Sequence, residues 1–334
     1  LNVKKTISCN SGTAAIHLAF DAIDLKKNDV ILMPVINFIS SYNMAKLYDA
    51  KIYLCDVNPL TGLVTPKTIL DCIKKNKLKK IKCILVMHLG GIVENVEEFF
   101  ELKKKYKCFL IEDACHAFGS SYKVKNKIYM VGSCKHSDIA CFSFHPIKTI
   151  TTGEGGAITT NNKKFYERSI KFRSHNIIKK NFQDYNIDRL GFNYRLSDIN
   201  CALGISQLNK IRRFIFKRSK IREFYKKKLN KLSSQLKIID SIDLTQNSNH
   251  LIIVQFNNLK IKKRFIKYFQ NHNIFVQYHY IPIYKFSYIN TYSIKSYPGS
   301  EYYYSRSVSI PNHAGLNKTE LDKIINLFYK FFKA

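Results

Sequence analysis

The segment Ser143 to Ala157 reads SFHPIKTITTGEGGA, and it places Lys148 between an apolar run and a glycine-rich turn. The closest acidic residue within the segment is Glu154, beyond the run of threonines. Burial without an ion-pair partner lowers the pKa of a lysine, and the resulting neutral amine can form a Schiff base. The segment therefore predicts that Lys148 anchors a cofactor, although a single lysine in a chain with so many is otherwise expected to be a surface charge.

A second candidate is Asp113, which ends the apolar run KCFLIEDA and is flanked by small residues. A buried carboxylate at the end of a strand needs a cationic partner. A protonated pyridine nitrogen would be such a partner, and holding that proton makes the ring an electron sink. A helix N-cap is the alternative role for Asp113, and the residues alone leave both roles open.

A turn of small residues, Asn10-Ser11-Gly12-Thr13, precedes an apolar pattern that is typical of a helix. The free N–H groups and the hydroxyl at such a helix start suit a phosphate. Serine and threonine also cap many helices for structural reasons alone, so the turn by itself indicates little.

Short apolar runs alternate with helical patterns over the first half of the chain. Strands are predicted at 30–34, 51–57, 81–89, 107–114, 139–144 and 156–160, and helices near 38–48, 66–75, 96–105 and 163–173. This alternation predicts an α/β fold with a mostly parallel sheet flanked by helices, in which ligands gather at the carboxyl ends of the strands. The polar stretch 174–189 is predicted to be an exposed loop or flap.

The second half of the chain has a different pattern. The apolar spacing predicts one long helix over 197–232 and, after a linker at 241–249, a strand, a helix and a strand at 250–256, 261–271 and 274–280, with a last helix at 318–332. We therefore expect a large cofactor-binding domain at 1–208 and a smaller α+β domain at 209–334.

Composition excludes some classes of protein. The formal net charge of +31 suits nucleic acid or an anionic membrane, but the lysines are spread along the chain as they are on solvated helix faces. No apolar run approaches the roughly 18 residues of a membrane helix. The nine cysteines lie singly, without metal-site spacing. We expect a cytoplasmic protein that has no metal site and binds neither membrane nor nucleic acid. Because the first residue is Leu1, we also expect that an N-terminal segment is missing.

Four ordered motifs together carry a family resemblance. Besides the lysine segment they are SGTAAIHLA, IEDACHAFGS and GFNYRLSDINCALGISQL, which begin at residues 11, 111 and 191. They resemble the DegT/DnrJ/EryC1/StrS family of sugar aminotransferases, which are fold-type I enzymes that use pyridoxal 5′-phosphate (PLP). Nearly the whole chain is covered by this resemblance.

The resemblance implies a role for each matching residue. Lys148 would form the Schiff base with PLP, Asp113 would pair with the pyridine nitrogen, His116 would lie near the ring oxygen, and Phe38 would stack on the ring. Further cofactor-binding positions are implied at Gly12, Thr13, Ser143 and Asn193. Because Asn193 matches a residue that reaches into the neighbouring subunit, the resemblance also implies a homodimer with shared active sites.

The substrate is implied by segments at 172–182, 248–254, 276–286 and 309–317, above all by the form HYIPIY that begins at His279. They imply amination by glutamate at C4 of a UDP-linked 4-keto-6-deoxy-N-acetylhexosamine, in pseudaminic acid or related surface-glycan biosynthesis. The candidate substrate contacts are Ser143, Asn193, Gln277, Tyr278, His279 and Tyr280. Amination at C3 or of a dTDP-linked sugar is the alternative, and a basic nucleic-acid-binding protein is the alternative of another class.

Overall fold

A computed structural model describes residues 1–181, 183–240, 246–289 and 297–333. Residue 182 and residues 241–245 of the predicted linker lie outside the described residues. The centre of the molecule is a seven-stranded sheet with the order β1-β9-β8-β5-β4-β2-β3. Its strands are β1 (Lys5–Cys9), β2 (Val30–Pro34), β3 (Lys51–Cys55), β4 (Cys83–Met87), β5 (Phe109–Asp113), β8 (Ile139–Ser143) and β9 (Gly156–Thr160). Among these seven strands β9 alone runs against the others, so the predicted mostly parallel α/β sheet is confirmed.

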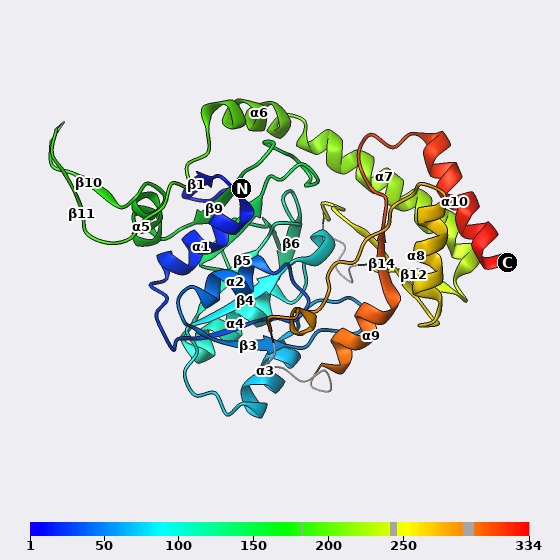
Figure 1. Cartoon of the computed structure of the whole chain (residues 1–334), viewed down its shortest axis with the longest axis horizontal. Coiled ribbons are helices and arrows are strands. Elements are labelled where there is room, and N and C mark those ends of the chain that lie inside the picture. Colours follow the sequence, from blue (N-terminus) through cyan, green and yellow to red (C-terminus); the bar gives the residue numbers. More distant parts are fainter. Residues whose placement is uncertain (182, 241–245, 290–296, 334) are drawn as a thin grey trace.

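Helices flank this sheet in the order that the sequence predicts (Figure 1). They are α1 (Gly12–Ala22), α2 (Ser40–Lys46), α3 (Pro66–Lys75), α4 (Val96–Tyr106) and α5 (Lys163–Arg173), with the short 3₁₀ helix η1 (Leu89–Gly91). The first of them, α1, is buried from Ala14 to Ala22 because it packs between the sheet, α2 and α5. The Ser11 side chain caps α1 by accepting a hydrogen bond from the Ala14 amide at 3.0 Å.

Two β-hairpins lie outside the seven-stranded sheet. One is β6 (Ser121–Val124) with β7 (Lys127–Met130), and the other is β10 (Ile177–Lys179) with β11 (Tyr185–Ile187). The second hairpin extends away from the molecule as a narrow arm (Figure 1) and lies in the stretch predicted as a loop or flap. Arg189 fixes its base by pairing with the buried Asp21 at 2.8 Å.

The C-terminal half forms a second lobe with its own hydrophobic core. Its three-stranded sheet has the order β12-β13-β14, and α7, α8 and α10 lie around it (Figure 1). The elements of the chain from residue 198 onward are α6 (Asp198–Leu208), α7 (Ile211–Leu229), η2 (Asn230–Leu232), β12 (Leu236–Ile238), β13 (Ile252–Phe256), α8 (Ile261–Asn271), η3 (Ile283–Lys285), α9 (Pro298–Arg306), β14 (Ser307–Ile310) and α10 (Lys318–Lys333). Of these, η3 packs into the core of the large sheet. The domain boundary between residues 208 and 209 stays a prediction.

The sequence-based prediction of one helix over 197–232 is wrong. The helix breaks after Leu208 and restarts at Ile211, because the Lys210 amide bonds the Gln207 carbonyl at 3.0 Å and so tightens the turn. The two pieces also pack differently: α7 buries apolar residues in the second lobe, whereas α6 buries none of its own.

The strand predicted at 274–280 is also wrong. Within the described chain this segment makes only an isolated bridge, in which the amides and carbonyls of Gln277 and Ser309 exchange hydrogen bonds of 3.1 and 2.8 Å. Beyond that pair the chain leaves the small sheet, since the side chains that follow pack against the large sheet.

Candidate active site

The first part of the site lies where α1 starts and β8 ends. A Cβ atom added to Gly12 would lie 2.8 Å from Ser143 Cβ and 3.1 Å from its hydroxyl, so this close approach requires glycine. The amides of Gly12 and Thr13 begin α1 and have no acceptor within the helix, and its first turn has no acidic residue. Helix amides, the helix dipole and the Ser143 hydroxyl together make a cradle for an anion such as a phosphate.

Lys148 lies in the loop between β8 and β9, a few residues from Ser143. The loop holds its shape because the Lys148 amide bonds the His145 carbonyl at 2.9 Å, while Glu154 pairs with His145 at 3.7 Å. No described residue accepts a hydrogen bond from the Lys148 amine. Burial lowers the pKa of Lys148 and outweighs the opposing effects of Cys115 and Asp113, and a lower pKa makes the nucleophilic neutral amine easier to form.

Asp113 ends β5 and is 2% exposed. One of its oxygens accepts a hydrogen bond from the Cys115 amide at 3.2 Å. Among the described residues no cationic side chain pairs with it, although the Lys148 ammonium and the Asp113 carboxylate act on each other electrostatically. The chain continues from Asp113 into β6 and not into a helix, so the N-cap alternative is wrong. A buried carboxylate of this kind needs a cation from a ligand.

His116 lies just beyond Asp113 and is fully enclosed. Its Nδ1 accepts from the Gly90 amide at 3.3 Å, so its Nε2 carries the hydrogen and donates it to the Tyr280 hydroxyl at 2.8 Å. Burial first, and then the charge of Lys148, hold the pKa of His116 well below its usual range. The neutral imidazole leaves the hydroxyl proton of Tyr280 free to donate to a ligand.

Phe38 completes the wall on the far side of Tyr280. The two ring centroids are 5.8 Å apart, and Phe38 is 51% exposed although it is a large hydrophobic residue. An exposed aromatic face beside an enclosed polar cluster is suited to stack on a planar ligand.

Of the other predicted substrate contacts, only His279 joins this cluster. Its Nδ1 is 2.8 Å from the Ser309 hydroxyl, and burial together with the charge of Lys148 lowers its pKa to about 4. Gln277 and Tyr278 are exposed, and the Tyr278 ring lies on the second lobe. Asn193 is exposed as well: its carbonyl accepts from the Asn10 side chain at 3.3 Å, and within the described chain its side chain has no contact with the cluster. The roles of all these residues stay predictions.

One residue near the site was missed by sequence reasoning. His250 is buried, and its ring lies 4.3 Å from that of His116. Neither of its ring nitrogens has a hydrogen-bond partner among the described residues. Its pKa is held well below the usual range by burial and then by Lys148. The sequence shows it only as the polar residue that opens the run HLIIVQF.

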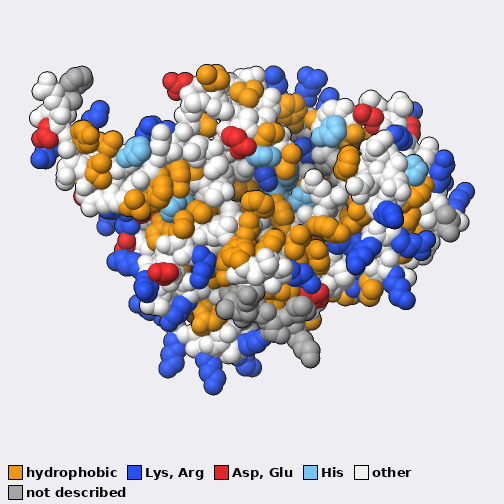
Figure 2. All heavy atoms as spheres, viewed as in Figure 1, with side chains coloured by type: hydrophobic (Ala, Val, Ile, Leu, Met, Phe, Trp, Pro, Cys, Tyr) orange, Lys and Arg blue, Asp and Glu red, His pale blue; other side chains and the backbone are white. Residues whose placement is uncertain are grey.

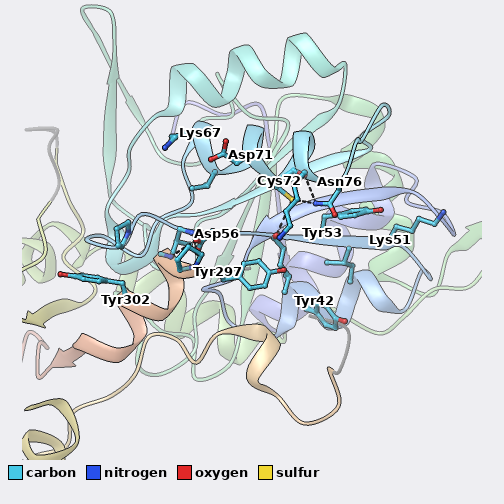
Figure 3. Close-up of a pocket in the computed structure, with 18 of the residues that line it drawn as sticks. Tyr42, Lys51, Tyr53, Asp56, Lys67, Asp71, Cys72, Asn76, Tyr297 and Tyr302 are labelled. Atoms are coloured by element: carbon cyan, nitrogen blue, oxygen red, sulfur yellow. Dashed lines mark hydrogen bonds between the residues drawn. The ribbon is translucent and has the colours of Figure 1, made fainter. Parts of the chain in front are cut away.

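A large cavity lies elsewhere, along the edge strand β3. It has a volume of about 1240 Å³ and is lined by β3, α3 and the start of α9 (Figure 3). Tyr42, Tyr53 and Tyr297 face it, and Cys72 at its wall accepts a hydrogen bond of 3.6 Å from the Asn76 amide group. None of the described residues that line it belongs to the predicted site.

The arrangement around Lys148 fits PLP in three respects. It offers an anion cradle at Gly12, a buried carboxylate without a cation at Asp113, and an unpaired amine at Lys148. On a mostly parallel sheet with a small C-terminal lobe, this combination defines a fold-type I PLP-dependent transferase. No group of three or more His, Cys, Asp or Glu side chains in the described chain could hold a metal ion.

Comparison with known proteins gives the family. Residues 1–328 match the model of the DegT/DnrJ/EryC1/StrS aminotransferase family. The chain belongs to this family, and the predicted family and fold class are thereby confirmed.

Named relatives and solved structures are similar over most of their length. A Campylobacter jejuni (strain 81-176) protein named UDP-4-amino-4,6-dideoxy-N-acetyl-β-L-altrosamine transaminase is 37% identical over 320 residues, which are 95% of this chain and 82% of that protein. The solved structure of Helicobacter pylori PseC, an aminotransferase of pseudaminic acid biosynthesis, superposes with a TM-score of 0.90 at 28% identity, over 100% of this chain and 88% of that one. The PLP form of a putative sugar aminotransferase from Streptococcus pneumoniae has the same fold, with a TM-score of 0.89 at 23% identity over 99% and 88% of the two chains.

Proposed function

We propose that this chain is a PLP-dependent aminotransferase that moves an amino group from glutamate to C4 of a UDP-linked 4-keto-6-deoxy-N-acetylhexosamine, in pseudaminic acid or related surface-glycan biosynthesis. The observation that carries the proposal is the unpaired Lys148 amine beside the buried, unpaired Asp113 carboxylate. The substrate is supported by the transaminase names of relatives that are 35% and 37% identical to it. The alternative of a nucleic-acid-binding protein is wrong, since the chain belongs to an aminotransferase family. Its Lys and Arg side chains are also spread over the face in Figure 2.

When bound, PLP supplies an aldehyde that carries the amino group and a ring that withdraws electrons. The residues of the chain do the rest. The Lys148 amine takes and returns the proton at the carbon that loses or gains the amino group. The Asp113 carboxylate would keep the proton on the pyridine nitrogen, the Gly12 and Ser143 cradle would hold the phosphate, and the Phe38 ring would stack on the cofactor. His116 and Tyr280 offer a fixed hydroxyl donor beside it.

The substrate assignment is tested by an assay of purified protein with PLP, glutamate and a panel of keto sugars. The panel includes UDP-, dTDP- and GDP-linked sugars, because an Escherichia coli O157:H7 relative that is 36% identical over 69% of this chain is named GDP-perosamine synthase. We expect amination of the UDP-linked 4-keto-6-deoxy-N-acetylhexosamine at C4, identified by mass and NMR. A preference for another nucleotide or another carbon would refute the proposed substrate, but the proposed aminotransferase activity would stand.

We propose further that the protein works as a homodimer with shared active sites. The helix α6 buries none of its own residues. Four of its apolar side chains are exposed, namely Ile199, Leu203, Ile205 and Leu208. A mostly apolar cavity of about 1180 Å³ continues from α6 over the strands beside the Lys148 loop. A second copy that covers this face would bring its projecting hairpin and Asn193 toward the first copy's site.

The dimer is tested by the substitution Ile205→Glu. A charge on this face is expected to halve the molar mass measured by light scattering after size-exclusion chromatography, and to lower turnover because Asn193 no longer reaches its partner. The control is Leu259→Glu, which alters an equally exposed apolar residue on the second lobe and should leave the mass unchanged. A monomeric wild type, or a dimeric Ile205→Glu variant, would contradict this interface.

For the compartment, we propose the cytoplasm. All nine cysteines are free thiols, and thiols stay reduced there. In the described part of the chain no helix has the length and apolar character needed to cross a membrane.

A further inference from the structure

The second lobe contains an unusual lysine. Lys262 of α8 is 4% exposed, while Lys263 and Lys267 of the same helix are solvated. Its ammonium group lies 4.1 Å from the ring centroid of Tyr278 and 4.2 Å from that of Tyr304. It also donates a hydrogen bond to the Tyr304 carbonyl. Two aromatic faces and one carbonyl thus enclose this amine.

The enclosure lacks a compensating acid. No carboxylate among the described residues pairs with Lys262, because Glu301 of α9 pairs with Lys285 at 2.7 Å. Burial first, and then the like charge of Lys285, lower the pKa of Lys262 to about 7. Cation–π contact with the two tyrosines favours the charged form. Two further neighbours of α8, β13 and α10, meet it through apolar rings: the centroid of Phe265 lies 4.8 Å from that of Phe256 and 5.0 Å from that of Phe328.

The enclosed Lys262 amine contacts the segment Gln277–Tyr280 directly through Tyr278 and indirectly through α9. Tyr278 is itself one wall of the enclosure. Tyr304, the other wall, follows Tyr303, whose hydroxyl donates to the His279 carbonyl at 2.9 Å. Tyr303 and Tyr304 both belong to α9. Its first amides, those of Gly299 and Ser300, bond the Asp56 carboxylate beyond β3 at 2.8 Å each. The α9 helix therefore fixes the segment to the large sheet.

The segment itself has little backbone support. Its bridge to β14 ends at Gln277, so the positions of Tyr278 and His279 depend on these side-chain contacts. A change at Lys262 acts on Tyr278 directly and on His279 through α9.

We propose that Lys262 is a positioning residue that, in its charged form, clamps Tyr278 and so fixes the segment Gln277–Tyr280 for the nucleotide-sugar substrate. This inference rests on the proposed function of that segment. The folded protein holds the amine charged below about pH 7 and neutral above it, while the unfolded chain keeps it charged up to its ordinary pKa near 10.5. The clamp is therefore closed at pH 6 and relaxed at pH 8. As the pH rises from about 7 toward 10.5, the fold becomes more stable, because the unfolded state binds more protons there than the folded state does.

The test compares Lys262→Met with Lys263→Met, an exposed neighbour on the same helix, at pH 6 and pH 8. In the wild type we expect KM for the keto sugar to rise about threefold from pH 6 to pH 8, as the cation–π contact is lost. In Lys262→Met, KM for the keto sugar should be high at both pH values, while kcat should equal that of the wild type. Lys262→Arg keeps its charge and should hold KM low at both. The Lys263→Met control should follow the wild type.

Two measurements separate a role in positioning from a role in folding. Methionine fills a similar volume and removes a buried charge, so the melting temperature of Lys262→Met should equal or exceed that of the wild type. In protein with labelled tyrosine rings, the NMR signal of Tyr278, assigned through Tyr278→Phe, should shift with a midpoint near pH 7 in the wild type and lose that step in Lys262→Met. A wild-type KM and pH profile in Lys262→Met, or a Tyr278 signal without the step, would overturn the clamp. If the Tyr278 signal shifts with pH but the protein aminates no keto sugar, the proposed function is overturned, while the contact between Lys262 and Tyr278 stands.

Discussion

Replacement of Lys148 by alanine is expected to lower turnover by a factor of at least about 10² to 10⁴, the usual effect of removing a positioned proton-transfer group. The Lys148 amine is the nucleophile in the loop between β8 and β9, and burial lowers its pKa, which makes the neutral form easier to reach. The variant should still hold PLP non-covalently, because the anion cradle and Asp113 are unchanged. Borohydride reduction followed by peptide mass spectrometry should place PLP on the Lys148 peptide in the wild type alone.

Two controls accompany this variant. Lys148→Arg keeps the positive charge but offers no Schiff-base nucleophile, and we expect it to be as inactive as alanine. Lys163→Ala removes a lysine that is exposed at the start of α5 and should keep full activity. Covalent PLP in Lys148→Ala, or turnover close to that of the wild type, would refute the assignment.

Asp113→Asn should raise the melting temperature of the protein without PLP and should weaken its binding of PLP. In the protein without PLP, Asp113 is a buried carboxylate with no cationic partner among the described residues. Asparagine keeps the hydrogen bond from the Cys115 amide, and removing the charge should raise the melting temperature. With PLP, the protonated ring nitrogen loses its partner. Because leaving a buried charge unpaired costs about 3 to 5 kcal/mol, PLP should bind about 10² to 10⁴ times more weakly.

The matched control is Asp138→Asn at the opposite end of the neighbouring strand β8. Asp138 pairs with Lys103 at 2.8 Å and accepts from the Leu110 amide at 2.8 Å. Its substitution should lower the melting temperature without changing PLP affinity, measured by absorbance titration. If Asp113→Asn binds PLP as tightly as the wild type, Asp113 does not pair with the ring nitrogen.

The large lobe was the more predictable part of the structure. Continuous apolar runs such as CILVM in β4 have few alternatives to a buried parallel strand, and α3 was predicted with its observed bounds because Pro66 and Lys75 mark its ends. By contrast, β1 was missed because it is short and mixed in polarity, and its place is set only by pairing with β9. Such long-range pairing leaves no local periodicity.

In the candidate site, too, residues with a local sequence pattern could be predicted, whereas residues whose surroundings depend on long-range contacts could not. Residues in motifs around Gly12, Asp113 and Lys148 could be named because Gly12 and Asp113 lie at the ends of regular elements and Lys148 lies in the loop that follows β8. His250 could not be named, since its importance comes from stacking on His116, a residue far from it in the chain. Lys262 was indistinguishable from the other lysines until its burial between two tyrosines was known.

The isolated bridge at Gln277 has a consequence for how such enzymes diversify. The segment is attached to the small sheet by one pair of backbone hydrogen bonds. Its exposed residues Gln277 and Tyr278 can accept substitutions without disturbing either hydrophobic core, whereas Tyr280 packs against the large one. Asp113 and His116 lack this freedom, because both are buried in the large lobe. Under the substrate role proposed for this segment, descendants of one ancestral chain can acquire new sugar preferences at these exposed positions while inheriting the amino-transfer chemistry unaltered.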